Sequence, residues 1–219
     1  MPVRSLLASG ENRKCGAKPF AAPIFMRTLL ACCVAAAVAA APTSAPANDS
    51  VRNFVERLND ASVALSASSS NQVARQKCRR LLAWAFDVPA MARYALGDAW
   101  PKATAAERRK YLNAFEDGLI TVYVRRVAAN RGMTLLFVGT RPQSGGHQLA
   151  GTRMIVPNKP EQTWIWRLRP AGRSWRVIDV LTNGSSTLQA ERQKYARILE
   201  ANPGDIDAVI AFIRRQDNK

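Results

Sequence analysis

Hydrophobic residues along most of the chain recur every three or four positions, which is the spacing of one face of an α-helix. Near residue 50, for example, Phe54, Leu58 and Leu65 keep this spacing with polar residues between them. The same pattern returns several times, separated by serine, glycine or proline. It predicts helices at 50–66, 73–85, 87–97, 104–130 and 186–202, and a last helix around 206–213.

Local motifs mark where two of the central helices begin. Asp87 precedes Pro89 by two positions, so the aspartate is the expected N-cap and the proline lies in the first turn. Thr104 and Glu107 have the spacing of a capping box, and they open the longest predicted helix.

The second half of this longest helix is apolar around much of its circumference. One arc carries Phe115, Leu119 and Val122, and the adjoining arc carries Ile120 and Tyr123. The helix therefore either lies between two layers of the protein or lines an interior space.

After Gly132 the hydrophobic period changes from 3.6 to two, which predicts strands. Short turns rich in glycine and proline separate them, so an antiparallel meander is expected. The strands are predicted at 133–140, 147–156, 163–169 and 174–181. Trp164, Trp166 and Leu168 share one face of the third strand, which indicates one buried and one solvated face. The predicted class is α+β, with helices packed on one face of a curved four-stranded antiparallel sheet.

The first 47 residues have the three parts of a secretory signal peptide. A basic start is followed by an uncharged run at 29–41, and then by small residues that end in Ala45-Pro46-Ala47. The run is too short to span a bilayer, which needs about 20 residues. We expect cleavage before Asn48, which leaves a single domain at 48–219. Met26, which immediately precedes Arg27, is a second candidate for the true start.

Removal of the presequence changes how the charge and the cysteines are interpreted. The remaining 172 residues contain 27 Lys and Arg against 15 Asp and Glu. Outside the cytoplasm the abundant polyanions are lipid headgroups and acidic protein surfaces, so no nucleic-acid partner is expected. Cys15, Cys32 and Cys33 leave with the presequence, and Cys78 alone cannot form an internal disulfide. The fold is therefore expected to depend on its core.

Residue combinations typical of enzymes are scarce in this sequence. His147 is the single histidine in the sequence. No second histidine is available to complete a metal cluster or a Ser-His-Asp triad. We predict no catalytic residue, no metal site and no cofactor. Asp179 lies between the apolar residues Ile178 and Val180, and an ion pair with an arginine is its expected role.

Two blocks of the sequence combine residues in a distinctive order. They contain Phe86-Asp87, Met91-Ala92-Arg93, Leu96-Gly97, Trp100, Ala103-Thr104, Glu107-Arg108, Tyr111 and Phe115, and then Trp175 to Val180, Gly184 and Ser186. At these positions the chain resembles the MlaC family, the periplasmic component of a system that maintains outer-membrane lipid asymmetry and that is also linked to toluene tolerance. The likeness covers roughly 50–215 and rests on dispersed positions in a fixed order. One departure is the turn Asn183-Gly184-Ser185-Ser186, where relatives often have Glu-Gly-Val-Ser.

This resemblance implies a carrier that moves one glycerophospholipid through the periplasm of a Gram-negative cell. Its partners would be an inner-membrane ABC transporter complex and an outer-membrane lipoprotein–porin complex. The acyl chains would occupy an apolar lipid pocket between the sheet and the helices. From their inward-facing positions, the candidate lining residues are Met91, Tyr94, Leu96, Phe115, Leu119, Tyr123, Phe137, Trp166, Val177 and Val180.

Three other interpretations stay open at this point. The chain could bind a hopanoid or another isoprenoid, as in the HpnM branch of the family. It could be a small enzyme of the nuclear-transport-factor-like kind, with Asp179 inside an apolar cavity. It could also be an adaptor with a solid core and a basic binding surface. No extended apolar seam remains for an obligate dimer, so we expect a monomer.

Overall fold

The computed structural model of the chain describes residues 47–217. The predicted presequence up to residue 46, including the alternative start at Met26, lies outside this range. The described residues belong to one compact unit. Its helices are α1 (Ala47–Ser66), α2 (Asn71–Ala85), α3 (Val88–Leu96), α4 (Ala105–Ala128), α5 (Thr187–Ala201) and α6 (Ile206–Asp217).

Both predicted helix starts are confirmed by their hydrogen bonds. The Asp87 carboxylate accepts from the backbone N–H of Ala90 at 3.2 Å, and it caps α3. Thr104 and Glu107 form both halves of the capping box of α4. The hydrogen bonds that Thr104 donates lower the pKa of the Glu107 carboxyl, because they stabilise its charged form.

The predicted antiparallel meander is also confirmed, with one addition. Consecutive strands pair in the order in which they occur in the sequence, and they form one sheet. Asn183 and Gly184 both have positive φ angles, of 51° and 79°, which are typical of a two-residue hairpin turn. This turn adds a short fifth strand directly before α5. The strands are β1 (Thr134–Pro142), β2 (Gln148–Ile155), β3 (Gln162–Ala171), β4 (Ser174–Thr182) and β5 (Ser185–Ser186).

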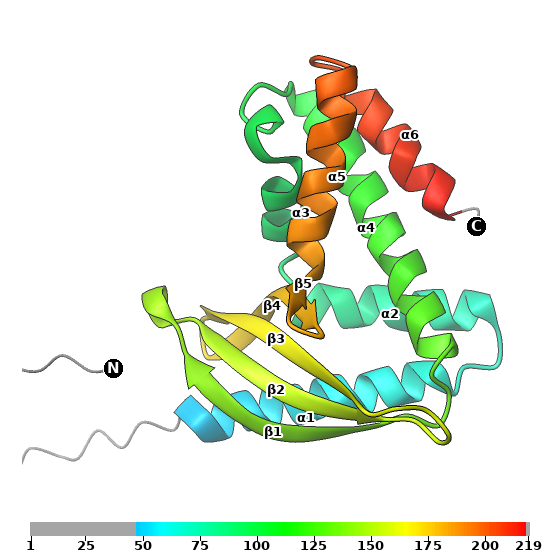
Figure 1. Cartoon of the computed structure of the whole chain (residues 1–219), viewed down its shortest axis with the longest axis vertical. Helices are drawn as coiled ribbons and strands as arrows, with labels where there is room; N and C mark the ends of the chain where they lie inside the picture. The colour runs from blue at the N-terminus through cyan, green and yellow to red at the C-terminus, as the bar shows by residue number, and fades with distance from the viewer. Residues whose placement is uncertain (1–46, 218–219) are drawn as a thin grey trace, which may run out of the picture. The chain divides into compact units, whose positions relative to one another are not determined.

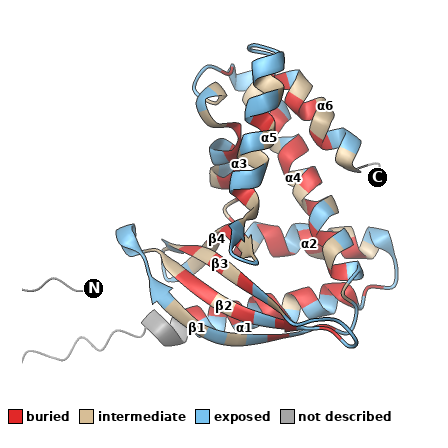
Figure 2. Cartoon of the chain, viewed as in Figure 1, coloured by how far each residue is buried: buried red, intermediate tan, exposed pale blue. Residues whose placement is uncertain are grey.

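Burial alternates along the strands as the sequence predicts. In β3, Trp164, Trp166 and Leu168 are buried, whereas Thr163 is exposed. Trp166 lies opposite Ala150 of β2 and Val180 of β4, so these residues share the inner face of the sheet. Figure 2 shows buried residues alternating with more exposed ones along β2 and β3.

The helices lie in two groups, as Figure 1 shows. α1 and α2 lie beside the sheet, and the other four helices lie beyond it. α1 packs along β1, β2 and β4, and it closes one part of the inner face. α3, α4, α5 and α6 stand together beyond the sheet, with α4 packed against α6 and α5 against α3. α5 also contacts β4, the strand that leads into it. The second group of helices and the inner face of β3 and β4 enclose the site described below.

Cys78 provides a direct test of this packing. Its side chain is fully buried in α2, and burial raises the pKa of its thiol to about 12, against the smaller opposing effect of Arg75 and Arg79. At pH 8 only about one molecule in ten thousand would carry a thiolate in the folded state. We expect a thiol-specific reagent to leave Cys78 unmodified in the folded protein and to react stoichiometrically in denaturant. Rapid labelling of the folded protein would show that α2 is not packed in this way.

Candidate functional site

The candidate site is a cavity of about 280 Å³ between the sheet and the second group of helices. Most of the side chains around it are apolar, and several are aromatic. Its walls come from β3, β4, α3, α4, α5 and α6, together with Phe86 before α3. The lining residues are Phe86, Met91, Phe115, Gly118, Leu119, Val122, Tyr123, Arg126, Trp164, Trp166, Val180, Thr187, Leu188, Ala190, Glu191, Lys194, Tyr195, Ile213 and Gln216.

The sheet side of the cavity is held rigid by a buried hydrogen-bonded pair. The indole N–H of Trp166 donates to the Thr152 hydroxyl oxygen at 3.1 Å, and that hydroxyl donates to the carbonyl of Trp164 at 3.4 Å. Thr152 and Trp166 are both fully buried. The rings of Trp164 and Trp166 lie 5.7 Å apart, so the two indoles form one continuous wall.

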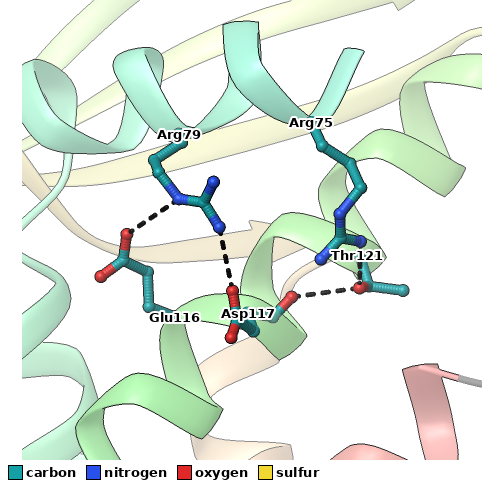
Figure 3. Close-up of polar contacts among 5 residues, drawn as sticks. All are labelled: Arg75, Arg79, Glu116, Asp117 and Thr121. Carbon is teal, nitrogen blue, oxygen red and sulfur yellow. Dashed lines mark hydrogen bonds and ion pairs between the residues drawn. The ribbon is translucent and has the colours of Figure 1, made fainter. Parts of the chain in front are cut away.

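The helical side is formed mainly by one face of α4, on which Leu119, Val122 and Arg126 lie three or four residues apart. The opposite face of α4 is fastened to α2, as Figure 3 shows. Arg79 binds Asp117 at 3.1 Å and approaches Glu116 at 3.9 Å. About half of each side chain in these ion pairs is exposed, so they orient α4 more than they stabilise the fold.

A second contact between α2 and α4 lies about one turn away from the first along α2. The guanidinium of Arg75 donates to the Thr121 hydroxyl at 2.7 Å, and that hydroxyl donates to the Asp117 carbonyl at 3.1 Å. Together with the Arg79 contacts, this bond fixes the rotation of α4. Leu119 is therefore directed toward the cavity while Asp117 and Thr121 face α2.

Tyr123 contributes its ring to the wall and uses its hydroxyl elsewhere. Its hydroxyl lies 2.7 Å from the Ser62 hydroxyl of α1, and the Ser62 hydroxyl donates to the Leu58 carbonyl. Burial raises the pKa of the Tyr123 phenol far above its ordinary value, so the ring stays neutral at any physiological pH. Tyr123 thus joins α4 to α1 without adding charge to the cavity.

The lining also includes charged residues from α4 and α5. Glu191 and Lys194 of α5 form an ion pair at 2.8 Å, so their charges largely offset each other. The guanidinium of Arg126 lies 5.5 Å from the centre of the Trp164 ring, in a cation–π contact. Val122, one turn before Arg126, is 41% exposed, which places this part of the wall at the opening.

Six of the ten lining residues predicted from the sequence lie on this cavity. They come from α3, α4, β3 and β4, and the fold brings them together around one space. They are Met91, Phe115, Leu119, Tyr123, Trp166 and Val180. Their contact with a ligand stays a prediction.

The other four predicted residues lie outside the cavity, two of them because of how α3 is rotated. Met91, Ala92 and Ala95 form the buried face of α3, so Tyr94 is turned outward and is 45% exposed. Its hydroxyl donates to Gln189, and Arg192 lies over its ring. Leu96 is buried at the end of α3, beside a separate surface hollow.

Phe137 and Val177 do face the inner side of the sheet, but other elements cover them. Phe137 lies on β1, where α1 packs, and the Arg52 guanidinium stacks 4.4 Å from the centre of its ring. Val177 is fully buried where the backbone N–H of Asp87 donates to its carbonyl at 2.9 Å. The chain entering α3 therefore pairs with β4 at Val177, and Val177 is not among the residues that line the cavity.

Sequence reasoning missed the contribution of α5 and α6 to the cavity. Leu188, Tyr195 and Ile213 lie in the helices predicted at 186–202 and around 206–213, but nothing in the local sequence indicated that these helices line the cavity. For two other lining residues, Trp164 and Arg126, the sequence did contain an indication. Trp164 shares its strand face with Trp166, and Arg126 lies one turn beyond Val122 on the same helix face.

Asp179 has a structural role that differs from the expected arginine ion pair. Its carboxylate accepts from its neighbour Val180 at 2.8 Å and from the backbone N–H of Leu188 in the first turn of α5 at 3.2 Å. In the register of β3 and β4, Asp179 lies opposite Arg167. Both residues are on the sheet face that points away from Trp166 and Val180. Asp179 is therefore not one of the residues that line the cavity. The observation that motivated an enzyme with Asp179 as its acid or base is thus removed.

Replacing Asp179 tests this structural role. Asp179→Asn keeps an acceptor oxygen but removes the negative charge at the N-terminus of α5, so the free energy of unfolding should fall by about 1 kcal/mol. Urea unfolding measures this change, and Asp60→Asn, on the exposed face of α1, is the control and should keep the original stability. An Asp179 variant as stable as the original protein would contradict the assignment.

The described part of the chain contains neither a cluster of metal ligands nor a membrane-spanning helix. Within residues 47–217, no three His, Cys, Asp or Glu side chains lie close enough together to hold a metal ion. No helix in that range is both long and apolar enough to cross a membrane.

These features define the chain as an α+β protein with an apolar cavity between its sheet and its helices. The model of the MlaC protein family matches residues 49–215, and the chain belongs to this family. A comparison with curated protein sequences finds no match.

Among solved structures, the chain is similar to a phospholipid-binding protein from Ralstonia solanacearum, which was determined in complex with a phospholipid. The two chains are 17% identical, and their structures align with a TM-score of 0.63. The alignment covers 80% of this chain and 98% of the Ralstonia chain. At this identity the comparison shows a shared fold.

Proposed function

We propose that this protein is an exported carrier that holds one glycerophospholipid with its acyl chains in the cavity between sheet and helices. The observation that carries this proposal is the apolar lining built from Phe115, Leu119 and Trp166 in a chain of the MlaC family. The phospholipid found in the Ralstonia protein, which has the same fold, supports it.

The energetics of lipid transfer explain what such a cavity must supply. Two acyl chains contain about 30 methylenes, and exposing each to water costs about 0.8 kcal/mol, so unassisted passage costs more than about 20 kcal/mol. A protein lowers this cost by offering an apolar lining, and transfer requires no bond to be made or broken. The aromatic walls of the cavity meet that requirement.

The family membership extends the proposal to partners and location. We infer that the protein works in the periplasm as a monomer and moves phospholipid between an inner-membrane ABC transporter complex and an outer-membrane lipoprotein–porin complex. The predicted signal peptide supports export, and the family role supports this route.

A two-chamber transfer assay tests the carrier function. Donor vesicles with labelled phospholipid and unlabelled acceptor vesicles are separated by a membrane that passes the protein but not the vesicles. We expect label to reach the acceptor at a rate proportional to protein concentration. If label moves only when the vesicles can touch, the protein is not a diffusing carrier. Periplasmic fractionation and light scattering test the location and the monomeric state.

A further inference from the structure

The wall of the cavity contains a positive charge that has no carboxylate partner among the described residues. Arg126 lines the cavity, is partly buried, and forms no ion pair within residues 47–217. The other cation of the lining, Lys194, is already paired with Glu191. Among the charged residues of the lining, Arg126 is therefore the one that remains available to a ligand anion.

A buried donor lies beside this charge. Trp164 is 4% exposed, and its indole N–H finds no acceptor in the described part of the chain. Its neighbour Trp166 does have an acceptor, the Thr152 hydroxyl. A buried N–H without a partner is destabilising, because it has lost its hydrogen bond to water, so native proteins rarely leave one unused.

The two features are in contact with each other. The Arg126 guanidinium lies over the Trp164 ring, 5.5 Å from its centre, and both residues line the same cavity. Val122 brings the adjacent wall to the surface, so the charge lies near the opening while the aromatic and aliphatic walls lie deeper. A ligand with an apolar body and an anionic, oxygen-rich end matches this arrangement.

We propose that Arg126 and Trp164 form the subsite for the phosphate end of the lipid. Arg126 pairs with a phosphate oxygen, and the Trp164 N–H donates to a phosphate or ester oxygen of the same molecule. This inference rests on the proposed carrier function and narrows its ligand. It favours glycerophospholipids over neutral lipids, including the hopanoid-type ligands left open by the sequence.

Two lipids that differ only in the headgroup test this subsite. Purified protein is incubated with vesicles containing labelled phosphatidylglycerol or labelled diacylglycerol with the same acyl chains, and the lipid bound per protein is measured. For Arg126→Gln we expect about tenfold weaker binding of phosphatidylglycerol, since a charge-assisted hydrogen bond is lost, and unchanged binding of diacylglycerol. Trp164→Phe, which removes the N–H, should weaken phosphatidylglycerol binding by about threefold.

A matched control exists on the same helix. Arg125 is exposed, donates to the Gln216 carbonyl at 2.9 Å, and is not among the lining residues. Arg125→Gln removes the same charge and should leave binding of both lipids unchanged. If it reproduces the Arg126→Gln effect, general attraction to the vesicle explains the result and the subsite is refuted.

The remaining outcomes separate the two proposals. Equal losses of both lipids in Arg126→Gln, or equal wild-type affinity for both lipids, would overturn the phosphate subsite and leave the carrier function standing. A wild-type protein that takes up neither lipid would overturn the carrier function itself. Inorganic phosphate at about 10 mM should not displace the lipid, because the acyl chains supply most of the affinity. Displacement would assign the subsite to free phosphate instead.

Discussion

Replacing Leu119 with glutamate should abolish phospholipid binding while the protein stays folded. Leu119 lies on the cavity face of α4, where its side chain is only partly buried. A carboxylate at this position would have to lose its water when acyl chains enter, at a cost of several kcal/mol. We expect lipid occupancy after vesicle incubation to fall by at least about tenfold, with the helical circular dichroism spectrum retained.

A substitution of the same kind outside the cavity provides the control. Val63 on α1 is 38% exposed and does not line the cavity, so Val63→Glu should bind lipid normally. Tyr123→Glu is a poorer probe, because Tyr123 is 8% exposed and hydrogen-bonded to Ser62, so its replacement would also destabilise the fold. A folded Leu119→Glu protein with normal lipid occupancy would show that the acyl chains lie elsewhere.

Truncating Trp166 should produce the largest loss of stability. Its side chain is fully buried in β3, forms the cavity wall and donates to Thr152. Trp166→Ala removes this buried ring and should lower the free energy of unfolding by about 3–5 kcal/mol, measured by urea denaturation. Domains of this size have a total stability of about 5–15 kcal/mol, so the variant should be close to unfolding.

A substitution at Thr152 separates the contribution of the Trp166 hydrogen bond to stability from the contribution of the packing of its ring. Thr152→Val preserves the shape of the side chain but leaves the Trp166 N–H without an acceptor, which should cost about 1–3 kcal/mol. The loss in Trp166→Ala should clearly exceed the loss in Thr152→Val. If the two losses are equal, the indole ring contributes little packing, and the cavity wall is not built as described.

Most of the fold could be predicted because its local patterns are strong. The capping box at Thr104 and Glu107 defines the start of α4. The shared strand face of Trp164, Trp166 and Leu168 identifies the inner face of β3. The extra strand β5 was missed because the sequence prediction ended the sheet with the strand at 174–181. An Asn-Gly turn instead reverses the chain and lets two more residues pair with β4.

The site was less predictable because its geometry depends on how elements rotate against each other. Tyr94 lies only one residue from the buried Ala95, yet its side chain lies at the surface beside α5, where Gln189 and Arg192 contact it. Phe137 has the right strand face, but α1 covers it. Residues on α5 and α6 could not be assigned to the cavity. The spacing of hydrophobic residues in a helix indicates which side of the helix is buried, but not which other elements pack against that side.

Native mass spectrometry can show whether this protein carries a phospholipid in the cavity between its sheet and its helices. The purified protein is measured intact, and bound molecules are then extracted into organic solvent and identified. We expect one phospholipid per chain, lost in Leu119→Glu and retained in Val63→Glu. A lipid-free protein that also takes up no phospholipid from liposomes would contradict this expectation.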